Sequence, residues 1–310
     1  MSDIMLSVLV LTYNQEKYIE KTLESILSQT HEYSYEIVIG EDCSKDNTKK
    51  IVEEFVEKYP EIIKPIYNNP NRGLIGNYFN SIAQCKGKYI MECAGDDWWL
   101  PGKISTQIEF MESHDDVGMC YGKAKVWNES KQRFEKKSCG DIRETFEDLL
   151  LNNNIPALSV CFRNDVFRRY IYEIDPEHQN WGMEDYPAWL WFSKESKIKF
   201  IDKELAGYRL LENSVSHNVN IEKQLAFERN VSEIKNYYRI KYGYSVINFN
   251  EEETRNWLFY RKILQSYDKE SAKELRKELN KKKSLRNLVK VFFISNKLLA
   301  IFGKYIIKFI

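Results

Sequence analysis

Residues 5–29, MLSVLVLTYNQEKYIEKTLESILSQ, decide the fold class. Residues 5–11 form an aliphatic run of strand length, rich in the leucine and valine typical of buried strands. In residues 15–29 the apolar side chains recur at helical spacing, so that they share one face. We therefore predict a strand, a polar turn and a helix, which is the repeating unit of α/β proteins.

The same alternation continues along the first third of the chain. Further strands are predicted at 35–40, 62–68 and 88–93, with helices at 45–59 and 74–85 between them. This order predicts an α/β fold with a mostly parallel, Rossmann-like sheet flanked by helices on both faces. Such sheets bind ligands at the carboxyl ends of their strands, which here read LTYNQE, GEDCSKDN, NNPNRG and CAGDDWW. We expect a polar pocket at that edge.

Beyond residue 115 the alternation changes. We predict strands at 117–127 and 157–163, a short helix in TFEDLLLN, a helix from about Tyr186, and two strands, KIKFID and ELAGYRLL. The last part reads as helices only, at 221–241, 251–266, 270–281 and 284–308. The predicted division is a domain at 1–218, with halves 1–115 and 116–218, and a helical extension at 219–310.

Composition restricts the possible functions. Hydrophobic residues make up 43% of the 310 residues, which suits a folded core. The 46 basic and 46 acidic side chains cancel, so we expect no nucleic-acid partner. None of the six cysteines forms a C-x-x-C pair, and the N-terminal residues lack the pattern of a signal peptide. These features predict reduced thiols and a cytoplasmic protein.

The turn after the first strand contains no glycine. LTYNQEKY therefore lacks the G-x-G-x-x-G loop, and the chain also has no P-loop, which are the two common phosphate cradles of such sheets. This argues against a dehydrogenase. If a nucleotide binds, a divalent cation held by carboxylates is the obvious substitute for the missing loop.

Asp96 and Asp97 are suited to hold that cation. They follow the strand at 88–93, and two unpaired neighbouring carboxylates repel each other unless a cation joins them. Mg²⁺ and Mn²⁺ prefer oxygen ligands and are often held by one or two carboxylates plus substrate phosphates. The alternative is that the acids cap a helix beginning near residue 101, although capping accounts for only one of them.

Six segments together resemble the family 2 glycosyltransferases, which have the A-type glycosyltransferase fold. The donor-side segments are SVLVLTYNQEKYIEKTLESILSQT, EIVIGEDCSKDNT, NRGLIGNYFNSIAQCKGKYI and CAGDDWWLPGKI. WGMEDYPAWLWF and AGYRLLENSVSH resemble acceptor-side segments, and the set covers about two thirds of the chain in the expected order. The resemblance implies metal-dependent, inverting transfer from a UDP- or dTDP-linked sugar to a glycan or lipid-linked acceptor in cell-surface polysaccharide synthesis. The Q-x-x-R-W motif of processive synthases is absent, so we expect transfer of a single sugar.

The resemblance also implies roles for single residues on the donor side. The first strand end would line the nucleotide pocket, Asp42 would accept the imide N–H of a uracil-type base, and Arg72 would lie near the ribose and phosphates. Asp96 would face the ribose or sugar, with Trp98 as a wall. The implied nucleotide-sugar contacts are Thr12, Tyr13, Glu16, Asp42, Arg72, Asp96 and Trp98. For Asp42 the alternative is a cap of the helix at 45, a role that we assign to Asp46.

Asp97 would bind Mn²⁺ or Mg²⁺, and Asp185 would be the catalytic base under the same resemblance. Alternatively, Glu184 and Asp185 are first-turn acids that stabilise a helix dipole. Ala94 stands where the family's acidic motif often begins with Asp, which mildly favours a second function, a catalytically inactive nucleotide-sugar-binding scaffold protein. A nucleotidyltransferase is a third possibility, but the glycine-rich loop it requires after the first strand is missing.

The end of the chain combines basic and apolar residues. Lys283, Lys290, Lys297 and Lys304 recur every seven residues and would form one stripe on a single helix. The lysines interrupt any run long enough to span a bilayer. We expect 283–308 to make peripheral contact with the inner face of the cell membrane. The alternative is a helix packed on the protein itself or on a partner subunit.

Overall fold

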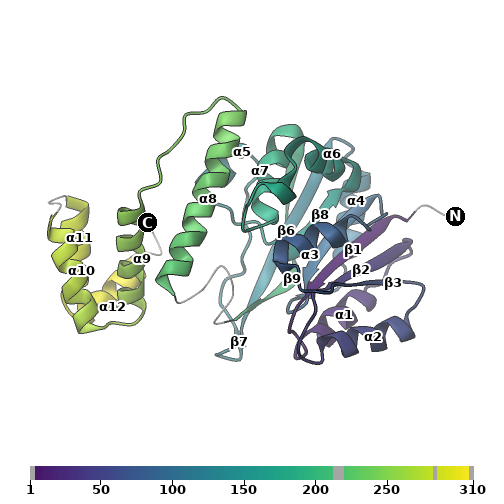
Figure 1. Ribbon diagram of the computed structural model, residues 1–310, viewed down its shortest axis with the longest axis horizontal. Helices are drawn as coiled ribbons and strands as arrows, with labels where there is room; N and C mark the ends of the chain where they lie inside the picture. Colours follow the sequence, from purple (N-terminus) through teal and green to yellow (C-terminus); the bar gives the residue numbers. More distant parts are fainter. Residues whose placement is uncertain (1–3, 212–219, 282–284, 307–310) are drawn as a thin grey trace. The chain divides into compact units, whose positions relative to one another are not determined.

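The computed structural model describes residues 4–211, 220–281 and 285–306. They divide into two compact units, the first ending at Leu211 and the second beginning at Glu212. The first contains a β-sheet, and the second is built of helices (Figure 1). The predicted α/β fold with a helical C-terminal part is confirmed.

A single mixed sheet forms the centre of the first unit. Within the described residues its order is β3-β2-β1-β4-β8-β6-β9-β5, and β7 pairs with β6. The first four strands in this order are parallel, β8 runs antiparallel to both of its neighbours, and β6 and β9 are again parallel. The strands are β1 (Leu6–Thr12), β2 (Tyr35–Glu41), β3 (Ile63–Tyr67), β4 (Tyr89–Ala94), β5 (Trp98–Trp99), β6 (Val117–Asn128), β7 (Arg133–Phe134), β8 (Val160–Arg163) and β9 (Lys197–Leu210).

Helices pack on both faces of this sheet. On one face Val8 and Val10 of β1 join a core with α1, α2 and α4. On the other face lie α3, α6 and α7 (Figure 1). There Phe162 of β8 packs against Phe167 and Trp189. The helices of this unit are α1 (Ile19–Leu27), α2 (Thr48–Lys58), α3 (Gly73–Ile82), α4 (Lys103–Glu112), α5 (Phe146–Leu151), α6 (Asn164–Ile174) and α7 (Asp185–Glu195), with short 3₁₀ turns at Ala157–Ser159 and Pro176–His178.

The directions of the strands place six strand ends at one edge of the sheet. Strands β1 to β4 are parallel, and β6 and β9 point the same way because the antiparallel β8 separates β4 from β6. We call this edge the site edge. It carries Thr12, Asp42, Asn68, Asp96, Asp97, Glu129 and Arg209 at or directly after the strand ends.

The segment 197–210 forms one strand, so the prediction of two separate strands is wrong. Strand β9 pairs with β6 from Lys197 to Leu210, with register shifts near Lys123 where the strand carries the charged Asp202 and Glu204. Backbone pairing therefore continues through a polar stretch that the sequence pattern treats as a break. As a result, a single strand reaches from the opposite edge of the sheet to the site edge.

The second unit consists of α8 (Ile221–Lys241), α9 (Glu251–Gln265), α10 (Lys269–Lys281), α11 (Leu285–Phe293) and α12 (Lys297–Ile306). The predicted single helix at 284–308 is wrong, because the helix is interrupted between Phe293 and Lys297. The hydroxyl of Ser295 donates to the Phe292 carbonyl, and Asn296 accepts from the Leu299 N–H at 3.0 Å. Short polar side chains that bond the backbone locally favour helix ends over helix interiors.

Part of the tail packs within its own unit. Ile294 and Ala300 are buried in a cluster with α9 and α10 residues, and Lys290 is buried with its ammonium 5.3 Å from the Trp257 ring centre. Leu288, Val289, Phe292 and Leu298 are exposed instead. Lys283 lies outside the described residues. None of the described helices is long and apolar enough to cross a membrane.

Candidate functional site

The acidic turn after β4 is fixed by neighbouring backbone and side chains. The Asp97 N–H donates to the Ala94 carbonyl at 3.0 Å, which closes the turn before β5. The Thr22 hydroxyl of α1 donates to the carbonyls of Gly95 (3.0 Å) and Asp97 (2.6 Å). Helix α4 begins only at Lys103, after Gly102, and has no side-chain cap. The acids therefore cap no helix at this point, and the capping alternative is wrong.

Both acids lie in surroundings that disfavour a bare negative charge. Asp97 is 5% exposed, and its Oδ1 accepts the Arg209 main-chain N–H at 2.7 Å. Burial, and then the Asp96 charge, raise the pKa of Asp97 well above its usual range. Burial also raises the pKa of Asp96, which the Arg209 charge opposes. A pair of this kind favours either a bound proton or a cation.

The donor atoms at this turn fit a magnesium or manganese ion that is shared with a ligand. Among the described residues there is no group of three His, Cys, Asp or Glu side chains placed to hold a metal. Asp96 and Asp97 supply two carboxylates, and hard cations of this size are often bound by one or two carboxylates together with substrate phosphates. Substrate phosphates would therefore have to complete any metal site at this turn.

Buried oxygen atoms without partners lie beside the turn. Thr12 Oγ1 and Gln15 Oε1 have no hydrogen-bond partner among the described residues. Both lie so close to the Cα of Gly95 that a side chain there would collide with them. The Gln15 side chain also hydrogen-bonds Asp96. A buried acceptor without a hydrogen-bond partner lowers stability, so this position favours a ligand or a water molecule that donates a hydrogen bond.

Trp98 is enclosed on several sides. Its side chain is 7% exposed and lies against Gly207 of β9, where even a Cβ atom would overlap the indole ring. The Lys21 ammonium lies 3.9 Å from the ring centre, and the Phe134 ring packs edge-on at 6.4 Å. The residue therefore lies at the site edge as expected, with little of its surface open to a ligand in this conformation.

Two predicted residues that follow the first strand differ in how accessible they are to a ligand. Tyr13 is 42% exposed, so its ring is accessible. The Glu16 carboxylate instead accepts the N–H (2.9 Å) and side-chain amide (2.8 Å) of Asn47. Asp46 accepts the Thr48 N–H at 3.0 Å and so bonds the first residue of α2, but the N-cap position predicted for it is taken by Asn47.

Asp42 organises the start of α3. Its carboxylate accepts the N–H groups of Arg72 (2.8 Å) and Gly73 (2.9 Å) and the Asn68 amide (3.0 Å). Asp42 thus stabilises the first turn of α3, whereas the sequence alternative was a cap of the helix that follows residue 45. Arg72 has an exposed side chain at the site edge.

Asp185 belongs to a second acidic group, together with Glu92 and Glu184. This group lies on the face of β4 that is covered by α3 and α7. Asp185 is the first residue of α7, and its Oδ1 accepts the Tyr186 N–H at 2.6 Å. Burial raises its pKa. Burial and the Asp185 charge raise the pKa of both Glu184 and Glu92 to about 8, and the Tyr78 hydroxyl donates to Glu92 at 2.6 Å. At neutral pH, Glu92 and Glu184 therefore favour their protonated forms beside Asp185.

The structure thus brings the predicted residues together in two groups. Thr12, Asp96, Asp97 and Trp98 surround the acidic turn, while Asp42 and Arg72 meet at the start of α3. Among the described residues, the negative charge of Asp185 instead acts on Glu92 and Glu184, whose pKa values it raises. Within the described part of the chain, no hydrogen bond or ion pair joins Asp185 to Asp97.

Sequence reasoning missed four residues of these groups: Gln15, Glu92, Glu129 and Arg209. Gln15 and Arg209 stand inside the quoted segments LTYNQEKY and AGYRLLENSVSH, but no local pattern marks their role. Glu92 stands in a strand that reads as apolar, and no local pattern marks it.

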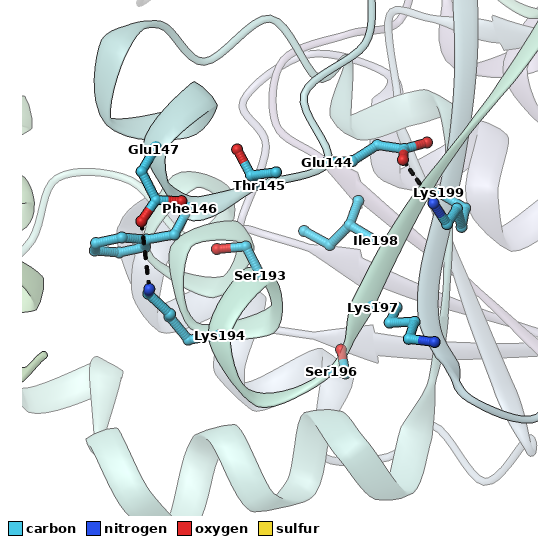
Figure 2. A pocket seen from close by; sticks show the side chains of 10 residues that line it. All are labelled: Glu144, Thr145, Phe146, Glu147, Ser193, Lys194, Ser196, Lys197, Ile198 and Lys199. Atoms are coloured by element: carbon cyan, nitrogen blue, oxygen red, sulfur yellow. Dashed lines mark hydrogen bonds and ion pairs between the residues drawn. The ribbon is translucent and has the colours of Figure 1, made fainter.

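Two cavities in the described part of the chain lie away from this site. One, of about 340 Å³, is lined by the start of α5, the end of α7 and the start of β9 (Figure 2). Lys194 and Lys199 pair there with Glu147 and Glu144. The start of β9 lies at the edge opposite the site edge, and no predicted site residue lines either cavity. We assign no role to them.

Comparison with solved structures supports the fold. The chain is similar to S. aureus TarS in complex with UDP, with a TM-score of 0.58 and 18% identity, covering 94% of this chain and 78% of that one. A complex of TarS with UDP-GlcNAc gives a TM-score of 0.59 over 93% of this chain. At this identity the likeness concerns the fold alone.

Curated relatives match large parts of the sequence. TuaG of Bacillus subtilis, provisionally a teichuronic acid biosynthesis glycosyltransferase, is 28% identical over 69% of this chain and 82% of its own length. WfgD of Escherichia coli, a UDP-Glc:α-D-GlcNAc-diphosphoundecaprenol β-1,3-glucosyltransferase, is 27% identical over 70% of this chain and 82% of its own. An uncharacterized Mycobacterium tuberculosis protein is 30% identical over 51% of this chain, which spans about half of that relative's length (46%).

The family model described as "Glycosyl transferase family 2" matches residues 7–174, more than half of the chain. This range contains the acidic turn, the buried Thr12 and the Asp42 carboxylate that holds the start of α3. The chain therefore belongs to glycosyl transferase family 2.

Proposed function

We propose that this chain transfers a single sugar from a nucleotide-diphosphate sugar to a hydroxyl of a glycan or lipid-linked acceptor in cell-surface polysaccharide synthesis. The observation that carries the proposal is the Asp96–Asp97 turn, with Asp97 buried and Asp96 half-buried, at the site edge of a family 2 fold. The names of TuaG and WfgD support the acceptor class. The TarS complexes with UDP and UDP-GlcNAc support a UDP-linked donor, with dTDP as the other candidate nucleotide.

Asp97 would hold a Mn²⁺ or Mg²⁺ ion, which would supply Lewis-acid stabilisation of the charge on the departing diphosphate, and Asp96 would face the ribose or sugar. The chain's own residues orient the rest of the donor. Thr12 Oγ1 is a buried oxygen at this turn with no partner among the described residues, and the exposed Tyr13 and Arg72 offer a ring and a cation for the nucleotide. Asp42 would accept the base N–H in addition to its bonds to α3.

Asp185 would take the proton of the acceptor hydroxyl. The acceptor oxygen then bonds the anomeric carbon, the bond from that carbon to the diphosphate breaks, and the nucleoside diphosphate leaves. A single in-line displacement of this kind inverts the anomeric centre. The raised pKa of Asp185 supports this role, because a more basic carboxylate accepts a proton more readily.

We also propose that the protein works on the cytoplasmic side of the cell membrane, in peripheral contact with it through 283–308. The exposed Leu288, Val289 and Phe292 of α11 and Leu298 of α12 support this contact. The exposed Lys297 adds a positive charge beside them. Because Lys290 is buried, its charge is not available to lipid headgroups, so apolar side chains would supply most of the membrane binding.

The decisive experiment combines ligand binding with turnover. In a thermal-shift panel of nucleotide-sugars, we expect a UDP- or dTDP-sugar to stabilise the protein with Mn²⁺ and much less with EDTA. Asp185→Asn should lower kcat by about 10²-fold or more, because a general base typically contributes that much, while donor affinity stays unchanged.

Asp165→Asn is the matched control. Asp165 is also a first-turn acid, in α6, and its Oδ1 also accepts the next residue's N–H. This variant should keep full activity. Loss of donor binding together with turnover in Asp185→Asn would indicate a structural role for that residue. Donor binding without any turnover by the unsubstituted protein would favour the scaffold function, which the missing acid at Ala94 supports.

A further inference from the structure

Arg209, near the end of β9, contacts both acids of the turn. Its main-chain N–H donates to Asp97 Oδ1 at 2.7 Å, and its side-chain Nε donates to the Asp96 carbonyl at 2.8 Å. The residue is 8% exposed. Arg209 therefore holds the acidic turn through two of its own groups. Its main-chain N–H binds the Asp97 carboxylate, and its side chain binds the main-chain carbonyl of Asp96.

The guanidinium group is itself held in place from two further directions. Its NH1 donates to Glu129 Oε2 at 2.6 Å, directly after β6, and Glu129 also accepts the Trp127 indole N–H at 2.9 Å. The Arg209 guanidinium carbon lies 4.4 Å from the Tyr18 ring centre and 5.2 Å from that of Trp98. The plane of the side chain is thus fixed by an ion pair and by two rings.

The chemistry of arginine suits this place. A guanidinium stays charged at every physiological pH, so it offsets the repulsion between the two buried acids whether or not a ligand is bound. Its planar set of donors can serve Asp96 and Glu129 together, whereas a lysine ammonium at the same distance from the backbone presents a single point charge.

We propose that Arg209 is a positioning residue that fixes the Asp96–Asp97 turn in the geometry that binds the nucleoside diphosphate and its metal ion. This inference rests on the proposed function. Arg209 acts through the two acids, and Glu129 keeps its side chain in orientation. The tether from the Arg209 backbone to Asp97 survives a side-chain substitution, whereas the tether to Asp96 does not.

The test uses the full chain and Arg209→Lys, which keeps the charge and loses the planar donors. We expect the affinity for UDP in the presence of Mn²⁺, measured by calorimetry, to fall about tenfold or more. The KM for the donor should rise by a similar factor, while kcat at saturating donor changes less. A residue that only stabilised the fold would not separate KM from kcat in this way.

Arg163→Lys is the matched control. Arg163 also packs over an aromatic ring, that of Tyr89 at 5.3 Å, and donates to main-chain carbonyls, but at the edge of the sheet opposite the site edge. Its substitution should lower the melting temperature at least as much as Arg209→Lys does and leave UDP affinity within about twofold.

Three outcomes would count against the inference. If Arg209→Lys binds UDP like the unsubstituted protein, or if both arginine variants lose affinity in proportion to their melting temperatures, Arg209 has no positioning role and the proposed function stands. If the unsubstituted protein itself binds no UDP with Mn²⁺, the UDP-linked donor of the proposed function is wrong and the inference falls with it.

Discussion

At the scale of single residues, the buried carboxyl group of Glu92 links pH to stability. Burial raises its pKa from 4.5 to about 8, and Tyr78 donates to it at 2.6 Å. A carboxyl whose pKa is higher in the folded state binds its proton more tightly when folded. Its contribution to stability is full below about pH 4.5 and is lost as the pH rises through about 8.

Glu92→Gln should remove part of this pH dependence. The neutral amide mimics the protonated acid, so we expect similar stability at pH 4.5 and a variant more stable than the unsubstituted protein at pH 8.5, by on the order of 1–3 kcal/mol. Urea unfolding at the two pH values measures this. Glu57→Gln, on the exposed face of α2, should show no such difference. An equal offset of Glu92→Gln at both pH values would contradict the assignment.

Residues in local motifs could be predicted from the sequence, and residues that act through distant pairing could not. Thr12, Asp96 and Asp97 stand directly after apolar runs, and the structure places them at one edge. Arg209 bonds Asp97 across 112 positions of the chain, and no local pattern reports such a bond. Glu92 depends on α3 and α7 packing over the same face of β4.

At the scale of helices and strands, α5 offers a clear case of local control. Thr145 accepts the Asp148 N–H at 3.1 Å, and Asp148 accepts the Thr145 N–H at 3.3 Å, which is a capping box. Thr145→Ala should lower the free energy of unfolding by about 1 kcal/mol, since the Asp148 N–H loses its acceptor. Chemical denaturation measures the change.

Thr145→Ser is the control for that prediction, because serine keeps the hydroxyl that caps the helix. Its stability should stay within about 0.5 kcal/mol of the unsubstituted protein. Equal losses in both variants would show that the threonine methyl group, and not the cap, stabilises α5.

The positions of most helices and strands followed from periodicity, and the errors share one cause. The break at Ser295 and Asn296 and the continuity of β9 are both set by hydrogen bonds that a count of apolar residues does not include. At 294–297, hydrogen bonds from side chains to the backbone replace those of a continuous helix. At 202–204, strand β9 stays paired with β6 although it carries the charged Asp202 and Glu204. Apolar spacing alone gives the wrong answer in both places.

At the scale of the whole molecule, the second unit allows a test of membrane contact. Leu288, Phe292 and Leu298 are 55%, 56% and 75% exposed. Replacing all three by serine should weaken binding to vesicles that contain anionic lipid by at least about tenfold, since each buried methylene contributes about 0.8 kcal/mol. Co-sedimentation with vesicles measures the change.

A paired substitution elsewhere in the same unit is the control. Val246 and Ile247 are similarly exposed, at 53% and 57%, so replacing both by serine removes apolar surface outside the tail. This variant should bind vesicles like the unsubstituted protein. If the tail variant also binds normally, the exposed side chains serve a protein contact instead.

The two-part organisation could be predicted from composition and periodicity in broad terms only. The change from alternating strands and helices to helices alone is visible in the sequence around residue 219, and the first compact unit ends at Leu211. What the tail packs against could not be predicted, because Ile294 and Leu298 are equally apolar in sequence and yet one is buried and the other exposed. Burial there depends on where α9 and α10 lie.

The close contact between Gly207 and Trp98 also limits how the sequence can change over time. While the indole occupies that space, every mutation of Gly207 to a residue with a side chain is blocked. A smaller residue would have to replace Trp98 first, and that step by itself would leave a cavity beside Phe134 and Lys21. The order in which the two positions mutate therefore matters, and most mutational paths through this pair are closed.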